Sequence, residues 1–393
     1  MLDQFAPSDL AHIHREPKGG NAASTVLSPT DFSDAVAEIK NWDGYQPTPL
    51  WSLKILAGQL NVADLLYKDE GERFGLGSFK ALGGAYAAAR TLQTECSKQL
   101  GTSVSLADIR AGLHKDLTAS ITLVSATDGN HGRSLAWGAQ RFGAPCRIYI
   151  HRDVSEGRAE AMRAFGADVI RIDGDYDDSV RIAREEAEAN GWFIISDTSW
   201  EGYTEPPRAV MAGYGAMVHE IADQSPEPPT HVFLQGGVGG LAAAVTAGLT
   251  QIWGDSAPRV VIVEPDLAAC LYESARAGAM RAVQIEEETM MAGLSCGEPS
   301  PLAWAILDEE ASDFITIPDR MVAPAMRLLA RPLESDPSIV AGESAVAGLA
   351  AAIAIAQDDA LRAAFGFTDQ SRLLFIGSEG ATDPEIYQEI MAA

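Results

Sequence analysis

The 393-residue sequence has only four cysteines, and their spacing excludes two common kinds of site. No two of them form a CxxC pair, so the chain carries neither a zinc ribbon nor a thioredoxin-like redox motif. The triplet His12-Ile13-His14 is the remaining hint of a metal, but such pairs near a terminus are more often solvated. We therefore expect no metal site. The cysteines are Cys96, Cys146, Cys270 and Cys296.

Long hydrophobic runs are also absent. The longest, 345–356, has 12 residues, whereas a membrane-spanning helix needs about 20. Residues 1–17 contain no basic segment followed by an apolar one, so they do not resemble a secretory signal. We expect a cytoplasmic protein that has no membrane partner.

Positive charge is scarce, with 29 Lys and Arg against 55 Asp and Glu and a formal net charge of −26. This excess repels nucleic acid and anionic lipid, which favours a small-molecule partner. Because 47% of the residues are hydrophobic and only 21% are charged, a packed core is expected. The length suits two domains or one large one.

Apolar β-type runs alternate with amphipathic helical stretches, which indicates an α/β fold with mostly parallel sheets flanked by helices. The helix expected at 79–92 carries small residues on one face. Strands are expected at 62–70, 121–129, 146–151, 168–173, 192–198, 231–237 and 259–265. Helices are expected at 79–92, 131–142, 156–165, 178–190, 206–222 and 241–252.

The segment 92–188 is a βαβαβα block that could fold as a small domain of its own. The flanking segments 1–91 and 189–393 would then form a large domain. We expect a ligand in a cleft between the two, near the carboxyl ends of strands.

The glycine turn at 236–240 follows an expected strand and precedes an alanine-rich helix. Free N–H groups of such a turn and the helix dipole together favour a phosphate. The same residues also satisfy the GxGxxG/A pattern of dinucleotide sites, and Glu264 stands where a ribose-binding acid belongs. A turn that only connects strand to helix is the third interpretation.

Lys80 opens the helix expected at 79–92. A cation there opposes the helix dipole, so the position is unusual for a structural lysine. Desolvation and positive local potential would lower the pKa of its amine, which imine formation with an aldehyde requires. A solvated lysine remains the alternative.

The loop 125–132 also lies between an expected strand and an expected helix. It offers successive N–H donors for a carboxylate, a side-chain amide in Asn130 and an acid in Asp128. Asp128 could instead be a helix cap.

Four segments in order, 47–50, 78–80, 127–132 and 236–240, resemble the fold-type II pyridoxal-phosphate (PLP) enzymes of the tryptophan synthase β-like superfamily. Within that superfamily, the segments 73–84, 126–133, 197–204 and 378–383 resemble the diaminopropionate ammonia-lyases. The similarity runs from about residue 45 to 385. Four ordered motifs are more specific than one glycine turn, so they favour PLP over a dinucleotide.

The resemblance implies a role for each matching residue. Lys80 would form an imine with the cofactor and take the Cα proton of the substrate. Asn130 would bond the ring hydroxyl, and Ser378 would face the pyridine nitrogen, where a hydroxyl favours prompt elimination. The cofactor phosphate would be held by Gly236, Gly237, Val238, Gly239 and Gly240.

Two acids distinguish the expected substrate. Asp128 would hold its β-ammonium or act as a base on the face opposite Lys80, which would admit the D-isomer. Asp197 is the second catalytic candidate, since paired acids suit a cationic leaving group, although it could simply cap the end of a strand. The other expected substrate-binding residues are Thr127, Gly129, His131, Trp200 and Tyr203, of which the two aromatics could instead be core.

The sequence departs from the family at Gly377, where a hydroxyl residue is expected, and at Ala381, where an acid is expected. Cys270 and Cys296 could approach each other, but free thiols are expected in a cytoplasmic chain.

The expected function is therefore that of a homodimeric PLP-dependent carbon–nitrogen lyase. It would eliminate ammonia from 2,3-diaminopropionate, and the resulting aminoacrylate would hydrolyse to pyruvate and a second ammonia. Another 3-substituted alanine, such as serine, threonine or 3-hydroxyaspartate, is the alternative substrate. A nucleotide-binding dehydrogenase and a ligand-binding protein without catalysis are the alternatives of other classes.

Overall fold

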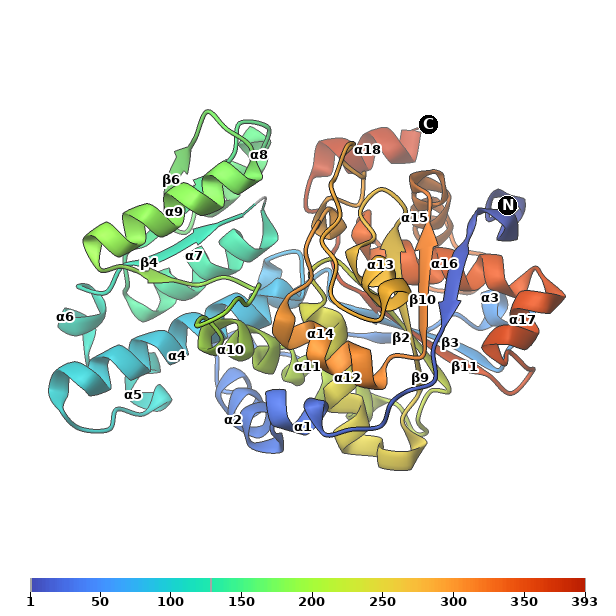
Figure 1. Ribbon diagram of the computed structural model, residues 1–393, viewed down its shortest axis with the longest axis horizontal. Coiled ribbons are helices and arrows are strands. Elements are labelled where there is room, and N and C mark those ends of the chain that lie inside the picture. Colours follow the sequence, from blue (N-terminus) through green and yellow to red (C-terminus); the bar gives the residue numbers. More distant parts are fainter. Residues whose placement is uncertain (1, 128, 393) are drawn as a thin grey trace. The chain divides into compact units, whose positions relative to one another are not determined.

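The computed structural model describes residues 2–127 and 129–392, which divide into two units (Figure 1). Unit 1 consists of Met1–Pro29, Pro47–Ser78 and Met217–Ala393. Unit 2 consists of Thr30–Gln46 and Phe79–Ala216. The chain therefore passes between the units four times.

A seven-stranded sheet with the strand order β1-β10-β9-β8-β11-β3-β2 organises unit 1. Its five inner strands are parallel, and the edge strands β1 and β2 pair antiparallel. The inner strands are buried along most of their length, as expected for a parallel sheet covered on both faces. The strands are β1 (Ala11–His14), β2 (Leu50–Ser52), β3 (Asp64–Asp69), β8 (His231–Gln235), β9 (Arg259–Pro265), β10 (Asp313–Ile317) and β11 (Arg372–Gly377).

The helix α16 (Ala347–Ala356) is the centre of the unit 1 core. All but its last residue are buried, and it packs against β8, β9, β10 and β11. Val261 and Val263 of β9 share its hydrophobic cluster. The other helices of unit 1 are α1 (Ala22–Val26), α3 (Lys54–Gln59), α12 (Gly240–Trp253), α13 (Cys270–Ala277), α14 (Pro301–Glu310), α15 (Val322–Ala330), α17 (Asp359–Phe365) and α18 (Pro384–Ala392), and α11 (Gly215–Gln224) begins at the boundary.

Unit 2 contains a parallel four-stranded sheet in the order β6-β5-β4-β7. Helices α7 (Asn130–Phe142) and α9 (Tyr176–Asn190) cover its two faces (Figure 1). Tyr149 packs with α9, whereas the preceding Ile148 approaches Gly132 of α7, because successive side chains of a strand point to opposite faces. The strands are β4 (Leu123–Ala126), β5 (Cys146–Ile150), β6 (Asp168–Arg171) and β7 (Phe193–Ile194).

The small residues of α4 allow close helix packing in unit 2. A β-carbon at Gly84 would lie 2.6 Å from Ser134 Oγ, and one at Gly138 would lie 2.7 Å from Ala85 Cα. The backbones of α4 and α7 therefore approach more closely than larger side chains would permit. The helices of unit 2 are α2 (Pro29–Ile39), α4 (Lys80–Leu100), α5 (Leu106–Arg110), α6 (Lys115–Thr118), α7 (Asn130–Phe142), α8 (Glu156–Arg163), α9 (Tyr176–Asn190) and α10 (Glu205–Gly213).

Single turns of 3-10 helix complete the secondary structure. They are Leu2–Gln4, Pro7–Asp9, Arg73–Gly75, Gly254–Ser256, Ala292–Leu294, Asp319–Met321 and Ser344–Val346.

The α/β prediction is confirmed, and every predicted strand contains an observed one. The segment predicted as helical, 206–222, is helical except at Tyr214, because α10 ends at Gly213 and α11 begins at Gly215. A β-carbon at Gly213 would lie 2.5 Å from Leu82 O, and one at Gly215 would lie 2.3 Å from the Phe32 ring. The chain thus breaks the helix where its backbone meets close neighbours.

The domain boundaries predicted at 91/92 and 188/189 remain a prediction about folding domains. The observed units divide elsewhere, and unit 2 includes all of 92–188 together with 30–46, 79–91 and 189–216. Helix α4 accounts for part of the difference, because its packing on α7 and α10 keeps it whole within unit 2.

In the described ranges, no individual helix has the length and apolarity to cross a bilayer. A pair that bends by 119°, Ser344–Ala356 with Asp359–Phe365, meets those criteria jointly.

Candidate active site

Lys80 is the first residue of α4, as the sequence predicts. Its ammonium forms an ion pair with the carboxylate of Asp197, which lies three residues beyond β7 in the same unit. Both side chains are about one-fifth exposed. The negative charge of Asp197 offsets the unfavourable position of a cation at a helix N-terminus, so the pair explains how the chain tolerates Lys80 there.

His131, on the first turn of α7, belongs to the same charged cluster. Its Nε2 lies 2.9 Å from Ile195 O and must donate, since a carbonyl only accepts. Its buried Nδ1 has no partner among the described residues. Burial lowers the pKa of His131 and outweighs the attraction of Asp197, so the ring is neutral near pH 7.

The carboxylate of Asp197 is held in its charged form. Burial alone would raise the pKa of Asp197, but the charge of Lys80 and the hydrogen bond that Lys80 donates lower it well below its ordinary value. The Asp197 side chain thus contacts the Lys80 ammonium directly. The Asp197 carboxylate therefore stays negatively charged and can balance a positive charge on the Lys80 amine.

The loop before α7 is ordered by its own threonine. Thr127 is buried, and its Oγ1 accepts hydrogen bonds from Gly129 N at 3.1 Å and from Gly132 N at 3.4 Å. Asn130 is the first residue of α7 and is half-buried. Asp128, the predicted second base, lies outside the described residues.

Trp200 and Tyr203 form a tight hairpin after Asp197. Each donates its N–H to the carbonyl of the other, at 3.2 and 2.9 Å, and Gly202 takes the positive φ of +79° that the turn needs. Their rings stack with centroids 3.9 Å apart. The Tyr203 hydroxyl is engaged with backbone groups of residues 194 and 196.

Tyr214, which no sequence motif indicates, lies beside the first turn of α4. Its ring centroid is 4.7 Å from that of Phe79, and a β-carbon at Gly83 would lie 2.6 Å from its Cε1. Its hydroxyl is buried and has no partner among the described residues. Burial raises the pKa of Tyr214, on which the charges of Lys80 and Asp197 also act. Gly213 and Gly215 on either side are the only sequence signal for it.

The glycine turn at 236–240 joins β8 to α12 in unit 1. Gly237 and Gly239 have φ values of +61° and +93°, which favour glycine. No side chain among the described residues caps α12, and the first N–H groups of any helix lack acceptors within it. The turn is therefore a cradle suited to a phosphate.

Glu264 does not serve as a ribose-binding acid. It is fully buried, and its carboxylate accepts the N–H groups of Leu271 at 3.0 Å and Tyr272 at 2.7 Å at the start of α13. A β-carbon at Gly236 would lie 2.4 Å from its Cγ. Burial raises the pKa of Glu264 to about 8. These contacts occupy the carboxylate that the dinucleotide interpretation assigned to a ribose.

Ser378 directly follows β11 and is buried in unit 1. Residue 377, just before it, is a glycine for a steric reason, because a β-carbon there would lie 2.2 Å from Cε1 of the buried Tyr67. Tyr67 in turn donates to Ala345 O at 3.2 Å. The unexpected glycine therefore makes room for an aromatic ring below the segment that carries Ser378.

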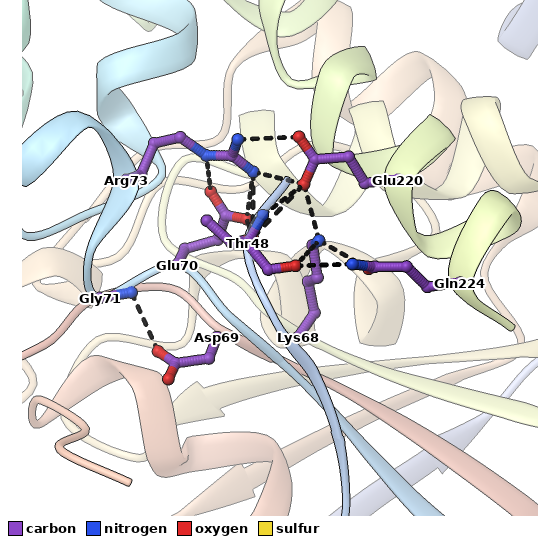
Figure 2. A network of polar contacts seen from close by, with 8 residues as sticks. All are labelled: Thr48, Lys68, Asp69, Glu70, Gly71, Arg73, Glu220 and Gln224. Atoms are coloured by element: carbon purple, nitrogen blue, oxygen red, sulfur yellow. Dashed lines mark hydrogen bonds and ion pairs between the residues drawn. The ribbon is translucent and has the colours of Figure 1, made fainter. Parts of the chain in front are cut away.

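A buried ionic network fixes two of the resemblance segments within unit 1 (Figure 2). Arg73 donates to both carboxylate oxygens of Glu70 and of Glu220, at 2.7 to 2.8 Å. Lys68 donates to Thr48 O, Glu220 and Gln224 at 2.7 to 2.9 Å. Burial alone would raise the pKa of Glu220, but Arg73 and Lys68 lower it.

Comparison with known proteins identifies the family of this chain. The family described as "Pyridoxal-phosphate dependent enzyme" matches residues 42–369. Diaminopropionate ammonia-lyase of Escherichia coli K12 is 39% identical over 354 residues, which cover 88% of each chain. The chain belongs to the diaminopropionate ammonia-lyase family of PLP-dependent enzymes.

Solved structures of this family share the fold. The Escherichia coli diaminopropionate ammonia-lyase in complex with D-serine has a TM-score of 0.88 and 35% identity, and covers 97% of this chain and 96% of that one. The same enzyme in complex with an "aminoacrylate-PLP azomethine reaction intermediate" has a TM-score of 0.86, 36% identity and the same coverage. PLP is thus the cofactor of the family, and the uncapped glycine cradle and the lysine at a helix start are groups that fit it.

The cysteines of this family member are free thiols. Cys270 is buried and donates to Gly237 O at 3.4 Å, and Cys296 is partly exposed. Within the described ranges, no group of three or more His, Cys, Asp or Glu side chains could hold a metal ion. The absence of a metal remains a prediction.

Proposed function

We propose that this chain binds PLP through Lys80 and the glycine turn at 236–240, and eliminates ammonia from 2,3-diaminopropionate. With one water consumed, the products are pyruvate and two ammonia. The observation that carries the proposal is the ion pair of Lys80 and Asp197 at the start of α4, in a chain 39% identical to a diaminopropionate ammonia-lyase.

The bound cofactor supplies an electron sink that makes the Cα proton of the substrate acidic. The Lys80 amine takes that proton. The charge that Lys80 gains is neutralised at once by Asp197, whose lowered pKa keeps it ionised. The β-ammonium then leaves as ammonia, and water completes the conversion to pyruvate. Asn130 would bond the ring hydroxyl and Ser378 would face the ring nitrogen.

Unit 2 supplies the candidate substrate contacts. Thr127 and Gly129 order the loop before α7, and His131 offers a buried nitrogen that lacks a partner among the described residues. Tyr214 offers a buried hydroxyl of the same kind. The substrate ammonium could donate to His131 Nδ1, and the substrate carboxylate could accept from the Tyr214 hydroxyl. Burial of such groups without partners otherwise costs free energy.

The test is pyruvate release from D- and L-2,3-diaminopropionate, measured beside L-serine, L-threonine and 3-hydroxyaspartate. We expect rapid turnover of the diamine alone. Turnover only of a hydroxy amino acid would replace diaminopropionate by that substrate. Lys80→Ala should abolish both turnover and the visible band of the bound cofactor, and retention of the band would reject Lys80 as the attachment site.

We further propose that the enzyme is a cytoplasmic homodimer that binds neither nucleic acid nor membranes. The net charge of −26 supports the last two points, because it repels phosphate backbones and anionic lipid. Light scattering of the purified protein tests the dimer: a monomeric mass would reject it.

A further inference from the structure

Three side chains of unit 2 form a layered stack beside the segment that leads to Asp197. The guanidinium carbon of Arg184, on α9, lies 3.7 Å from the centroid of the Trp200 ring. Trp200 stacks in turn on Tyr203, with 10° between the ring planes. Cation–π contact and ring stacking both restrict the side chains involved. The stack therefore holds the Tyr203 ring in one orientation.

The Tyr203 hydroxyl clamps the backbone just before Asp197. It donates to Ile194 O at 2.8 Å and accepts from Ser196 N at 3.0 Å. Burial raises the pKa of Tyr203, so the hydroxyl keeps the proton that it donates. Ser196 is the immediate neighbour of Asp197 in the chain.

Ile195, which lies between Ile194 and Ser196, is held by two other hydrogen bonds. Ile195 N donates to Val124 O at 2.8 Å, and Ile195 O accepts from His131 Nε2 at 2.9 Å. Three consecutive residues before Asp197 are thus fixed, although β7 itself has only two residues. A strand of two residues forms few hydrogen bonds with its neighbour. The hydrogen bonds with Tyr203, Val124 and His131 restrain this segment instead.

We propose that Tyr203 is a positioning residue for Asp197, and that the stack of Arg184, Trp200 and Tyr203 fixes its clamp. The inference rests on the proposed function, in which the Asp197 carboxylate balances the positive charge that Lys80 gains. It gives Trp200 and Tyr203 a role different from the substrate contact that the sequence suggests. Because both attachments involve the hydroxyl, a phenylalanine at position 203 removes them and keeps the ring.

The first test is Tyr203→Phe in the holoenzyme, with kcat, KM and the pH dependence of the cofactor absorbance as readouts. We expect kcat to fall about 10-fold with a smaller change in KM, because a displaced catalytic group affects turnover more than binding. The cofactor band responds to the protonation of the nitrogen that attaches it. A carboxylate nearby favours the protonated form, so the midpoint pH should fall when Asp197 is displaced.

The second test is the double variant Tyr203→Phe/Asp197→Asn. If Tyr203 acts through Asp197, the double variant has the midpoint pH and kcat of Asp197→Asn alone. An equal further loss in both backgrounds would overturn the inference, and so would a wild-type midpoint in Tyr203→Phe. If Asp197→Asn itself leaves turnover and midpoint unchanged, the role proposed for Asp197 fails, and the inference fails with it for a visibly different reason.

One further variant is a control, and another tests the stack. Tyr176→Phe removes the hydroxyl of an exposed tyrosine in the same unit, and should leave kcat and midpoint unchanged. Trp200→Leu removes the stacking ring and leaves the Tyr203 hydroxyl, so it should shift the midpoint in the same direction by less. A midpoint unmoved in Trp200→Leu would reject the role of the stack.

Discussion

Lys80 and Asp197 form an ion pair across 117 residues of sequence. Each accounts for an unusual feature of the other. Lys80 tolerates the N-terminus of α4 because a carboxylate meets it there. Asp197 stays ionised although it is mostly buried, because the charge of Lys80 lowers its pKa. In the proposed reaction Lys80 is the base, and the Asp197 carboxylate stabilises the ammonium that forms when Lys80 takes a proton.

The first prediction follows from this pair. Asp197→Asn keeps the size of the side chain and removes its charge, so the ammonium that forms at Lys80 loses its partner. We expect kcat to fall by about 100-fold or more, in the range of general acid–base contributions. Steady-state kinetics with 2,3-diaminopropionate measures the effect. A loss confined to KM would mean that Asp197 binds substrate without assisting the proton transfer.

Asp128 carries the stereochemical prediction. If it is the base on the face opposite Lys80, Asp128→Asn should lose turnover of D-2,3-diaminopropionate far more than turnover of the L-isomer. The ratio of the two kcat/KM values measures this directly and needs no correction for active fraction. Equal losses for both isomers would leave Asp128 with the β-ammonium as its only function.

The buried network predicts a pH-dependent loss of stability. Glu220→Gln leaves Arg73 and Lys68 with one carboxylate between them, and a broken buried pair costs about 3–5 kcal/mol. Glu220 has a lowered pKa in the folded state, so its contribution is present above its ordinary value of 4.5 and is lost as the pH falls below it. The difference from wild type should therefore be large at pH 7 and shrink below pH 4.5.

Denaturant titrations at several pH values measure this difference. Glu227→Gln is the matched control, since its partner is Arg372 and its carboxylate is mostly exposed. Exposed pairs contribute about 0–1 kcal/mol. Equal effects of the two substitutions would contradict a stabilising role for the network.

The parts of the fold that the sequence predicts are local in origin. Alternation of strands and helices, the glycine turn before α12 and the placement of Lys80 at a helix start follow from periodicity and turn chemistry within short windows. The sequence alone therefore indicates the glycine turn at 236–240 and the position of Lys80. The sequence predicts no strand before residue 62 or after residue 265, although β1, β2, β10 and β11 belong to the sheet of unit 1.

The remaining site features arise from contacts between distant segments. Nothing near Asp197 in the sequence indicates that its partner is Lys80, and Glu264 satisfies a ribose-binding pattern while its carboxylate caps α13. Tyr214 lies at a helix break that depends on the packing of Gly213 and Gly215 against Leu82 and Phe32. Spacing within one segment carries no information on such pairs.

Gly377 gives a steric prediction. Gly377→Ser would restore the hydroxyl residue that the family resemblance suggests, but its β-carbon would lie 2.2 Å from Tyr67 Cε1. Tyr67 is fully buried, so we expect a loss of about 1–3 kcal/mol from overpacking. Gly58→Ser is the control, because a β-carbon at Gly58 meets nothing within 4 Å. Thermal unfolding of both variants decides the matter, and an unaltered midpoint for Gly377→Ser would show that the ring moves freely.

Tyr214 gives a prediction in which activity falls while stability stays unchanged. Its hydroxyl is buried without a partner among the described residues, and removing such a group is neutral or favourable for folding. A structural tyrosine would therefore be replaced by phenylalanine at no cost to either property. If the hydroxyl bonds the substrate or cofactor beside Lys80, Tyr214→Phe should keep its unfolding midpoint and lose about 10-fold in kcat/KM. Unfolding curves and kinetics on the same preparation separate the two cases, and full activity in a stable Tyr214→Phe protein would remove Tyr214 from the site.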